Sequence, residues 1–512
     1  MSVHKAVAHP ETYVDSVLLL AATRAMSMVD GVTWATAVMA TPANLEALRA
    51  EGITDDALGS SSANDLVLAV TATDAPAADA AITAADQSLF SGRDAPTDRQ
   101  QAPPRSLAEA SERLSGVNVA IVSVPGPFAA LEAHKAMGAG MHVLLFSDNV
   151  TLDEEIELKQ RAVGLGRLVM GPGAGTAVLG GCGLGFANVV SRGRVGVVAA
   201  AGTGAQEVMS LLDQWGSGVS QVIGVGGRDL SEAVGGRMAR AAVRALDADP
   251  ATDVILLVSK PPDLEVARSV IAEATTTPLV AALIGLDAID GLPTTSVLSS
   301  TLEGGVVATM RLLGLPVPEL AGALEQAVRA SADRLAPERT AVHGLFSGGT
   351  LCYESLVLLD KVLGPVYSNI TLDRRHKLPA PPGASICLDL GEEEYTQGRP
   401  HPMIDPGARL AILHDAGQEP GAAVVLLDVV LGHGSHPDPA GVLAPVCAEI
   451  VDAGGPVVVA YVLGTGADPQ GLESQRQKLL DAGCIVAPTG ARACLAAAAL
   501  AQRRPELVRA LP

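Results

Sequence analysis

Aromatic residues, paired cysteines and long apolar runs are scarce in this 512-residue sequence. Aromatic residues make up 2% of it, so its cores must be built mainly from Ala, Val and Leu. No C-x-x-C pair is present, so metal-ligand spacing is absent, and we expect small, buried, reduced thiols. The six cysteines are Cys182, Cys352, Cys387, Cys447, Cys484 and Cys494. No run reaches the roughly 18 apolar residues that span a bilayer, and no signal-peptide pattern opens the chain. We therefore predict a cytoplasmic protein with no membrane partner.

Charge and composition narrow the class of protein further. The net charge is −21 and the isoelectric point about 4.8, which disfavours nucleic acid as a partner. A small anionic substrate stays compatible with this charge, because a few local N–H groups outweigh a distant field. A hydrophobic content of 48% with 54 glycines and 33 prolines is typical of α/β domains with many tight turns.

Short apolar segments alternate with amphipathic segments along most of the chain, which predicts parallel sheets with crossover helices. We expect Rossmann-like or flavodoxin-like domains and, from the length, three or four domains rather than a single core. We also expect the chain to form an oligomer. The predicted division is an N-terminal α/β domain (1–90), a polar linker (91–116) and three further domains (117–192, 193–320 and 321–512). The last two repeat the same order of strands and helices, which indicates an internal duplication.

Two similar glycine-rich turns open the duplicated domains. "VVAAAGTGAQEV" and "GLFSGGTLCYES" each pass from a strand through a Gly-Thr turn into a helix. Such a helix start offers unpaired N–H groups and partial positive charge, so two of them aimed at one point predict a two-sided phosphate or carboxylate site. The predicted anion-binding residues are Gly202, Thr203, Gly204, Gln206, Ser347, Gly348, Gly349 and Thr350. The alternative is that each turn is only a tight strand-to-helix connection.

The motifs together resemble a known family. "AGTGAQEV" and "GVGGRDL" are similar to the ligase domain of the succinyl-CoA synthetase α subunit, and "FSGGTLCYE" and "GHGSHPDP" to the C-terminal domain of its β subunit. The segment from Val117 to Gly173 resembles the CoA-binding domain of the α subunit. This order, together with "HPMID", resembles the FdrA family of fused acyl-CoA synthetase-like proteins. The resemblance implies a succinyl-CoA synthetase-like fold and covers nearly the whole chain.

Several family features are missing. There is no histidine between His142 and His343, so the phosphohistidine of the α-type ligase domain cannot form in this span. The supporting glutamate of that domain corresponds to Lys260. The third α/β run follows the second too closely to leave room for an ATP-grasp domain. The loop Gly173-Ala174-Gly175-Thr176 departs from the Asp-Cys-Gly-Thr of the FdrA family.

The resemblance and these departures favour chemistry on an acyl or carbamoyl phosphate without bound nucleotide. The FdrA resemblance implies the large subunit of a carbamoyltransferase, moving carbamoyl between oxamate and phosphate in allantoin and purine breakdown with smaller partner subunits. One alternative is an acyl-CoA ligase subunit, and another is a non-catalytic CoA-binding scaffold. Lys260 and Arg228 are the predicted catalytic cations. A solvated strand-end lysine is the alternative for Lys260.

Two further sets of residues are candidates. His401 and His436 lie in loops after predicted strands and are candidate acid–base groups, although "HPMIDP" and "HPDP" also fit turns that start helices. No metal geometry is recognised among them. The turn of Pro125, Gly126, Pro127 and Phe128 is similar to the CoA-binding loop of the α subunit, so CoA is the candidate cofactor. No tightly bound cofactor or metal is expected.

Overall fold

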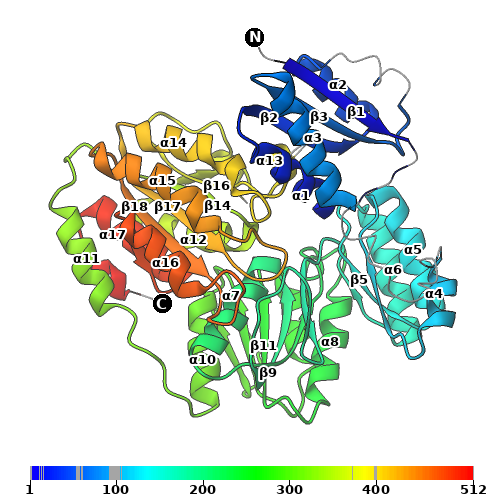
Figure 1. Cartoon of the computed structure of the whole chain (residues 1–512). Helices are drawn as coiled ribbons and strands as arrows, with labels where there is room; N and C mark the ends of the chain where they lie inside the picture. The colour runs from blue at the N-terminus through cyan, green and yellow to red at the C-terminus, as the bar shows by residue number, and fades with distance from the viewer. Residues whose placement is uncertain are drawn as a thin grey trace. The chain divides into compact units, whose positions relative to one another are not determined.

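The computed structural model describes residues 3–510 except 11, 13, 15, 54–57, 59–60, 91–103, 105, 372 and 397–399. It divides into two compact units, Met1–Pro103 and Pro104–Pro512 (Figure 1). Most of the predicted linker 91–116 lies outside the described residues, but Leu107–Arg113 form the helix α4 and belong to the second unit. None of the helices among the described residues is both long and apolar enough to cross a membrane.

The first unit is a three-stranded sheet of order β1-β3-β2 with helices on both faces. Its elements are β1 (Val3–His9), α1 (Ser16–Ser27), β2 (Val32–Met39), α2 (Pro42–Ala50), β3 (Leu66–Ala72) and α3 (Ala75–Phe90). The central strand β3 is antiparallel to both neighbours, so this unit is not one of the predicted parallel-sheet domains. The strand β3 is apolar except for Thr71, because α1 and α3 cover one face of the sheet and α2 covers the other.

The second unit begins with a small parallel sheet of order β4-β5-β6. Its elements are β4 (Val119–Val122), α5 (Gly126–Gly138), β5 (His142–Leu145), α6 (Leu152–Leu165) and β6 (Val169–Met170). The next strands, β7 (Thr176–Leu179) and β8 (Cys182–Gly185), instead join the following sheet, where β7 pairs with β10 (Val219–Gly224). The domain boundary predicted at residue 192 is therefore wrong for these two strands. They precede it in the sequence, but as an antiparallel hairpin they belong to the sheet that follows it. Cys182 is exposed on this hairpin, against the expectation of a buried thiol.

Two larger sheets carry the duplication. The first has the order β13-β12-β11-β9-β10-β7-β8 and the second β15-β16-β14-β17-β18-β19. Starting from β9 in one sheet and β14 in the other, five parallel strands follow the flavodoxin-like order 2-1-3-4-5 in both, with β15 added at an edge of the second. The predicted α/β class and the predicted internal duplication are thus confirmed.

The elements of these two sheets follow in chain order. The first half contains β9 (Arg192–Ala200), α7 (Gly202–Gln214), β10, α8 (Arg237–Asp247), β11 (Val254–Ser259), α9 (Leu264–Ile271), β12 (Leu279–Leu283), β13 (Ser296–Ser299) and α10 (Leu302–Leu312). The helix α11 (Gly322–Ala332) precedes the second half. That half contains β14 (Ala341–Phe346), α12 (Gly349–Leu363), β15 (Val366–Ser368), β16 (Ser385–Asp389), α13 (Glu393–Thr396), α14 (Leu410–Gln418), β17 (Ala422–Val430), α15 (Pro439–Asp452), β18 (Val457–Leu463), α16 (Leu472–Asp481), β19 (Ile485–Ala487) and α17 (Gly490–Gln502).

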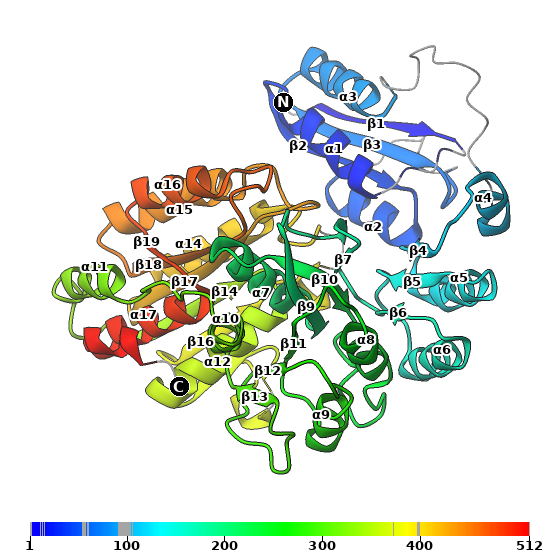
Figure 2. The same cartoon turned by 90° about the horizontal axis from the view of Figure 1, so that it is seen from below.

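The two halves pack through a shared layer of helices. The helices α7 and α10 lie on one face of the first sheet and α8 and α9 on the other (Figures 1 and 2). Residues of α7, α10, α12 and α17 form one apolar cluster with the inner faces of both sheets. The outer face of the second sheet is covered by α14, α15 and α16. This shared cluster places the starts of α7 and α12 together, which positions the site described next.

Candidate functional site

The helices α7 and α12 begin at equivalent places in the two sheets. Each follows the first strand of a 2-1-3-4-5 sheet, at the carboxyl edge where the direction of strand order reverses and where open α/β sheets bind ligands. The N-cap residues are Ala201 and Gly348, and neither helix start receives a side-chain capping bond. In contrast, the last helices α10 and α17 are capped by the hydroxyls of Thr301 and Thr489. The first N–H groups of α7 and α12 are thus left for a ligand or water.

The glycines of the two turns have different roles. A Cβ on Gly348 would lie 2.5 Å from Thr203 Cγ2, and one on Gly204 would lie 2.8 Å from Thr350 Cγ2. These two glycines allow the helix starts to touch each other. A Cβ on Gly202 would meet nothing within 4 Å, so this position faces open space. Gly349 approaches Asp389, whose Oδ2 would be 2.7 Å from an added Cβ.

A pocket of about 360 Å³ opens where the two helix starts meet. Of the predicted anion-binding residues, it is lined by Gly202, Thr203, Gln206, Gly348, Gly349 and Thr350. Lys260 lines the same pocket from the carboxyl end of β11. Among the residues of the lining, it is the one lysine or arginine. The Lys260 ammonium stands 5.1 Å from the centre of the Tyr353 ring, which holds it by a cation–π contact. The pocket therefore combines two helix dipoles with one cation.

Asp389 and His401 give the pocket its acid–base groups. Burial raises the pKa of Asp389 to about 7, although the Gly391 N–H and the charge of Lys260 favour the carboxylate. Burial lowers the pKa of His401 to about 4, so its ring is neutral at pH 7. The Met403 N–H donates to His401 Nδ1 over 3.3 Å, which leaves the proton on Nε2. Nε2 and Asp389 Oδ1 flank Gly391, at 2.7 and 3.2 Å from an added Cβ.

The pocket is also lined by two aromatic and two acidic residues that we did not select from the sequence. Phe146 and Phe186 lie 5.8 Å apart between ring centres, and Asp148 and Glu392 also line the pocket. Burial and the neighbouring carboxylate of Glu392 raise the pKa of Asp148. Phe146 and Asp148 directly follow the strand β5, so their position after a parallel strand was a usable signal.

Ser347 stabilises the fold through buried hydrogen bonds and does not line the pocket. Its N–H and its hydroxyl donate to Asp428 over 2.9 Å, and Arg409 donates to the hydroxyl over 2.9 Å. Arg409 and Asp428 are themselves a buried ion pair of 3.2 Å. Ser347 is therefore not an anion-binding residue as predicted, because a buried charge network already uses its polar groups. Gly204 does not line the pocket either, since it packs against Thr350.

Two predicted catalytic residues lie away from the pocket. Arg228 donates to Glu155 over 2.7 Å and to the Val150 carbonyl over 2.8 Å, which corrects its proposed role as a cation of this site. His436 accepts from the Asp438 N–H over 2.9 Å at Nδ1 and is absent from the pocket lining, so the turn interpretation describes it better. Asp438 caps α15, as that interpretation requires.

The turn of Pro125, Gly126, Pro127 and Phe128 starts α5, outside the pocket. Its N-cap Pro125 gives no side-chain capping bond, and Phe128 is 63% exposed. A Cβ on Gly126 would lie 2.4 Å from the Asn149 carbonyl, so the turn packs tightly on the loop after β5. Cys352, in the second glycine-rich segment, is fully buried, and burial keeps its pKa well above the usual value.

Glu207 and Glu354 tie the two halves together below the pocket. Glu207 of α7 accepts from the first N–H of α17, at Gly490, over 3.3 Å, and Glu354 of α12 accepts from the first N–H of α10, at Leu302, over 2.7 Å. Each carboxyl group thus caps the last helix of the other half. Burial raises the pKa of Glu207 to about 7 and that of Glu354 to about 8.

Segments at both ends of the chain match known protein families. Residues 1–104 match the family described as "AllF, heavy metal-associated domain", and residues 345–500 match the CoA-ligase family. The first of these names implies a metal, but the first 104 residues contain no cysteine, and no group of three or more His, Cys, Asp or Glu that could hold a metal occurs in the described residues. The donor set therefore does not fit a soft metal ion.

Relatives among known proteins extend this result. The ADP-forming sulfoacetate-CoA ligase subunit SauD of Bilophila wadsworthia is 30% identical over 34% of this chain and 61% of its own. The succinate–CoA ligase [ADP-forming] subunit alpha of Methanothermobacter thermautotrophicus is 27% identical over 30% of this chain and 52% of its own. The resemblance to succinyl-CoA synthetase α is thus supported, whereas the FdrA name stays a prediction. The uncharacterized protein YahF of Escherichia coli is 38% identical over 94% of this chain and 96% of its own length. The chain therefore belongs to the YahF family, with an AllF-type domain at its N-terminus and a CoA-ligase domain at its C-terminus.

Proposed function

We propose that this chain transfers an acyl group between phosphate and a thiol, so that acyl phosphate and coenzyme A give acyl-CoA and phosphate. The observation that carries the proposal is the pair of uncapped helix starts, α7 and α12, that meet at one pocket with Lys260. Backbone N–H groups and one ammonium group suit a phosphate and the negative charge that develops as it leaves. SauD and the succinate–CoA ligase subunit carry CoA-ligase names, which supports the same reaction class.

The pocket residues divide the chemistry between them. The first N–H groups of α7 and α12, with Lys260, bind the phosphate and stabilise it as the bond from the acyl carbon to oxygen breaks. The His401 Nε2–H donates a hydrogen bond to an oxygen of the bound group. Asp389 takes the thiol proton as the carbon–sulfur bond forms, since a pKa of about 7 lets it accept and return a proton near neutral pH.

His401 is unsuited to carry a phosphoryl group in this arrangement. Its Nε2 holds the proton because Nδ1 accepts from Met403, and a protonated nitrogen has no lone pair with which to attack phosphorus. We therefore assign the chain to the acyl phosphate step and not to transfer from ATP.

Coenzyme A fits the start of α5. The Gly126 N–H suits a phosphate, since Pro127 has no N–H and the Phe128 N–H donates to the Pro125 carbonyl over 2.9 Å. The exposed Phe128 ring suits the adenine. When bound, coenzyme A supplies the acceptor thiol. Gly126 keeps the turn close to the loop that follows β5. Phe146 and Asp148 of this loop line the pocket.

Carbamoyl transfer is the second candidate, with smaller partner subunits. Asp148, Asp389 and Glu392 all line the pocket and disfavour an acyl group that carries its own carboxylate. A carbamoyl group carries N–H donors instead, and carboxylates accept from them. This feature favours carbamoyl phosphate over succinyl phosphate as the acyl donor.

The test measures acyl-CoA from acetyl phosphate, succinyl phosphate and carbamoyl phosphate with coenzyme A, and phosphate release with oxamate as the alternative acceptor. Gly202→Val fills the pocket without a clash, because a Cβ there meets nothing within 4 Å. Gly466→Val is the matched control, since Gly466 is also exposed with open space around it. We expect turnover that falls at least about a hundredfold in Gly202→Val and stays unchanged in Gly466→Val. Equal turnover in both variants would contradict the proposed site, and phosphate release with oxamate alone would favour carbamoyl transfer.

A further inference from the structure

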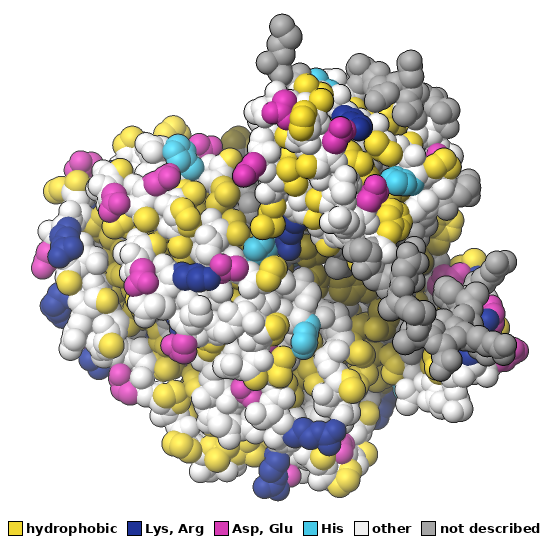
Figure 3. Space-filling view, in the orientation of Figure 1, with side chains coloured by type: hydrophobic (Ala, Val, Ile, Leu, Met, Phe, Trp, Pro, Cys, Tyr) yellow, Lys and Arg dark blue, Asp and Glu magenta, His cyan; other side chains and the backbone are white. Residues whose placement is uncertain are grey.

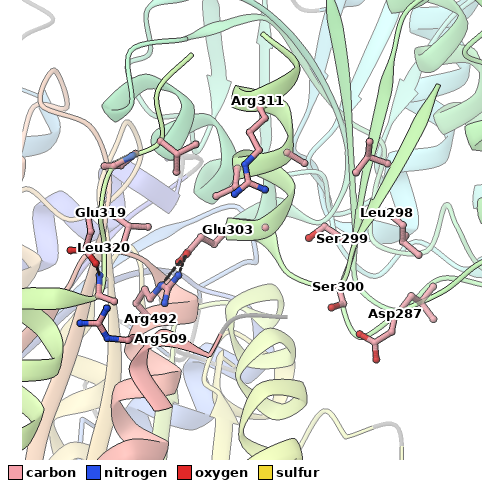
Figure 4. A pocket seen from close by; sticks show the side chains of 18 residues that line it. Asp287, Leu298, Ser299, Ser300, Glu303, Arg311, Glu319, Leu320, Arg492 and Arg509 are labelled. Carbon is pink, nitrogen blue, oxygen red and sulfur yellow. Dashed lines mark hydrogen bonds and ion pairs between the residues drawn. The ribbon is translucent and has the colours of Figure 1, made fainter. Parts of the chain in front are cut away.

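A second and larger pocket lies where the two halves of the second unit are joined. Its volume is about 880 Å³, within the range of small-molecule sites, and it is bordered by α10, the segment 317–321 and residues near the C-terminus (Figure 4). None of the residues that line it also lines the pocket between α7 and α12. Any ligand here would thus be separate from the acyl phosphate.

The carboxylates of this pocket already have partners. Glu303 is 1% exposed and accepts from Arg492 over 2.7 Å. Glu319 accepts from the two backbone N–H groups that begin α11, over 3.0 Å each. Asp287 accepts from Lys361 over 3.2 Å. No carboxylate in the pocket therefore needs a cation from a ligand.

The arginines of the pocket differ in this respect. Arg492 is held by Glu303 and by the Val508 carbonyl, and Arg509 donates to Glu325 over 2.6 Å. Arg311, in the last turn of α10, makes no side-chain hydrogen bond or ion pair with any residue that the structure describes. Figure 4 shows its guanidinium group directed toward the space that Ser299, Ser300 and Arg492 border. Arg311 is therefore the arginine of this lining that pairs with no side chain among the described residues.

The remaining wall is largely apolar. Leu286, Leu298, Val307, Val317 and Leu320 border the same space. A ligand that matches this lining has one anionic group for Arg311 and an apolar chain or ring for the wall. A nucleotide matches it poorly, because its several negative charges would face Glu303, Glu319 and Asp287.

We propose that this pocket is a second ligand site, which binds an apolar monocarboxylate whose carboxylate pairs with Arg311. The guanidinium group offers a planar set of donors that suits two carboxylate oxygens at once. The hydroxyls of Ser299 and Ser300 lie beside it in the lining. This inference does not rest on the proposed acyl transfer.

Isothermal titration of the full chain with octanoate tests the proposal, with octanamide and ATP titrated in parallel. Arg311→Gln removes the charge, and Arg334→Gln is the matched control because Arg334 is also exposed but lies outside the pocket. We expect saturable octanoate binding that is about tenfold weaker in Arg311→Gln and unchanged in Arg334→Gln. Octanamide should bind wild type about as weakly as octanoate binds Arg311→Gln.

A second variant and a second readout separate a lost site from a damaged fold. Ala308→Phe fills the pocket from α10, and we expect it to abolish octanoate binding. Both pocket variants should keep the far-ultraviolet circular dichroism spectrum of wild type, which shows that the fold is intact. Absence of octanoate binding to wild type, equal affinity in Arg311→Gln, or tighter binding of ATP than octanoate would overturn the proposal.

Discussion

At the scale of single residues, burial decides which polar groups of the pocket can take part in chemistry. Asp389 and His401 stand beside the same glycine, yet burial moves the pKa of one up to about 7 and of the other down to about 4. His401 is therefore neutral at pH 7, whereas Asp389 is partly ionised there. Lys260 and the helix starts attract an anion, and Asp389 opposes it increasingly as pH rises.

Asp389 should make anion binding depend on pH. Below its pKa of about 7 the group is neutral, and above it the carboxylate repels a bound anion, so affinity should fall as pH rises. Sulfate is the suitable probe because its charge is constant over this range. We expect the sulfate dissociation constant to increase about tenfold between pH 6 and pH 8.5 in wild type. In Asp389→Asn the constant should stay level, and an unchanged pH dependence in this variant would contradict the assignment.

At the scale of helices, exchanged caps join the two halves of the second unit: each half supplies a carboxyl group that caps the last helix of the other half. Glu207 and Glu354 are buried and each accepts from the first N–H of the other half's last helix. A raised pKa in the folded state means that folding favours the protonated carboxyl group. Its stabilising contribution is complete below the unfolded pKa of 4.5 and is lost as pH rises toward the folded pKa.

Glu354→Gln should therefore flatten the pH dependence of stability. Gln keeps an oxygen that accepts from Leu302 but has no proton to lose. For wild type we expect the free energy of unfolding to fall by about 1.4 kcal/mol per pH unit for this group between pH 4.5 and about 8. Urea unfolding at pH 5.5 and 7.5 measures it. The exposed Glu473→Gln is the control, and equal slopes in all three proteins would refute the exchanged-cap account.

How much of this site the sequence predicts depends on the range of each contact. Gly202 and Gly348 were found because a Gly-Thr turn between a strand and a helix is a local signal. The use of Ser347 by Asp428 and of Arg228 by Glu155 depends on residues 81 and 73 positions away. No spacing rule links such residues, so the sequence assigned both to the wrong role.

At the scale of the whole molecule, the chain divides into two units that differ in sheet type and family. The strands of the larger unit were predicted because buried parallel strands are continuous apolar runs, as in Val254–Ser259. The antiparallel order of the first unit and the transfer of β7 and β8 to the next sheet were missed. Both depend on pairing between strands, which the apolar pattern of one strand does not encode. On the face of the molecule in Figure 3, basic, acidic and apolar side chains are intermixed.

The two tryptophans of the chain lie one in each unit, at Trp34 and Trp215, so each unit can be followed by itself. In Trp34→Phe the fluorescence reports the second unit, and in Trp215→Phe it reports the first. All residues of the anion pocket lie in the second unit. Sulfate at about a hundred times its dissociation constant should stabilise that unit by about 2.7 kcal/mol and leave the melting of the first unchanged. Equal shifts for both reporters would contradict this division.

The most direct test of the account is the binding of inorganic phosphate to wild type and to Gly202→Val, measured by isothermal titration at pH 6.5. We expect one phosphate for each chain, with the affinity lost in Gly202→Val and kept in Gly466→Val, because a side chain at Gly202 would occupy the pocket between the starts of α7 and α12. Equal phosphate affinity in the two variants, or no phosphate binding by wild type, would contradict it.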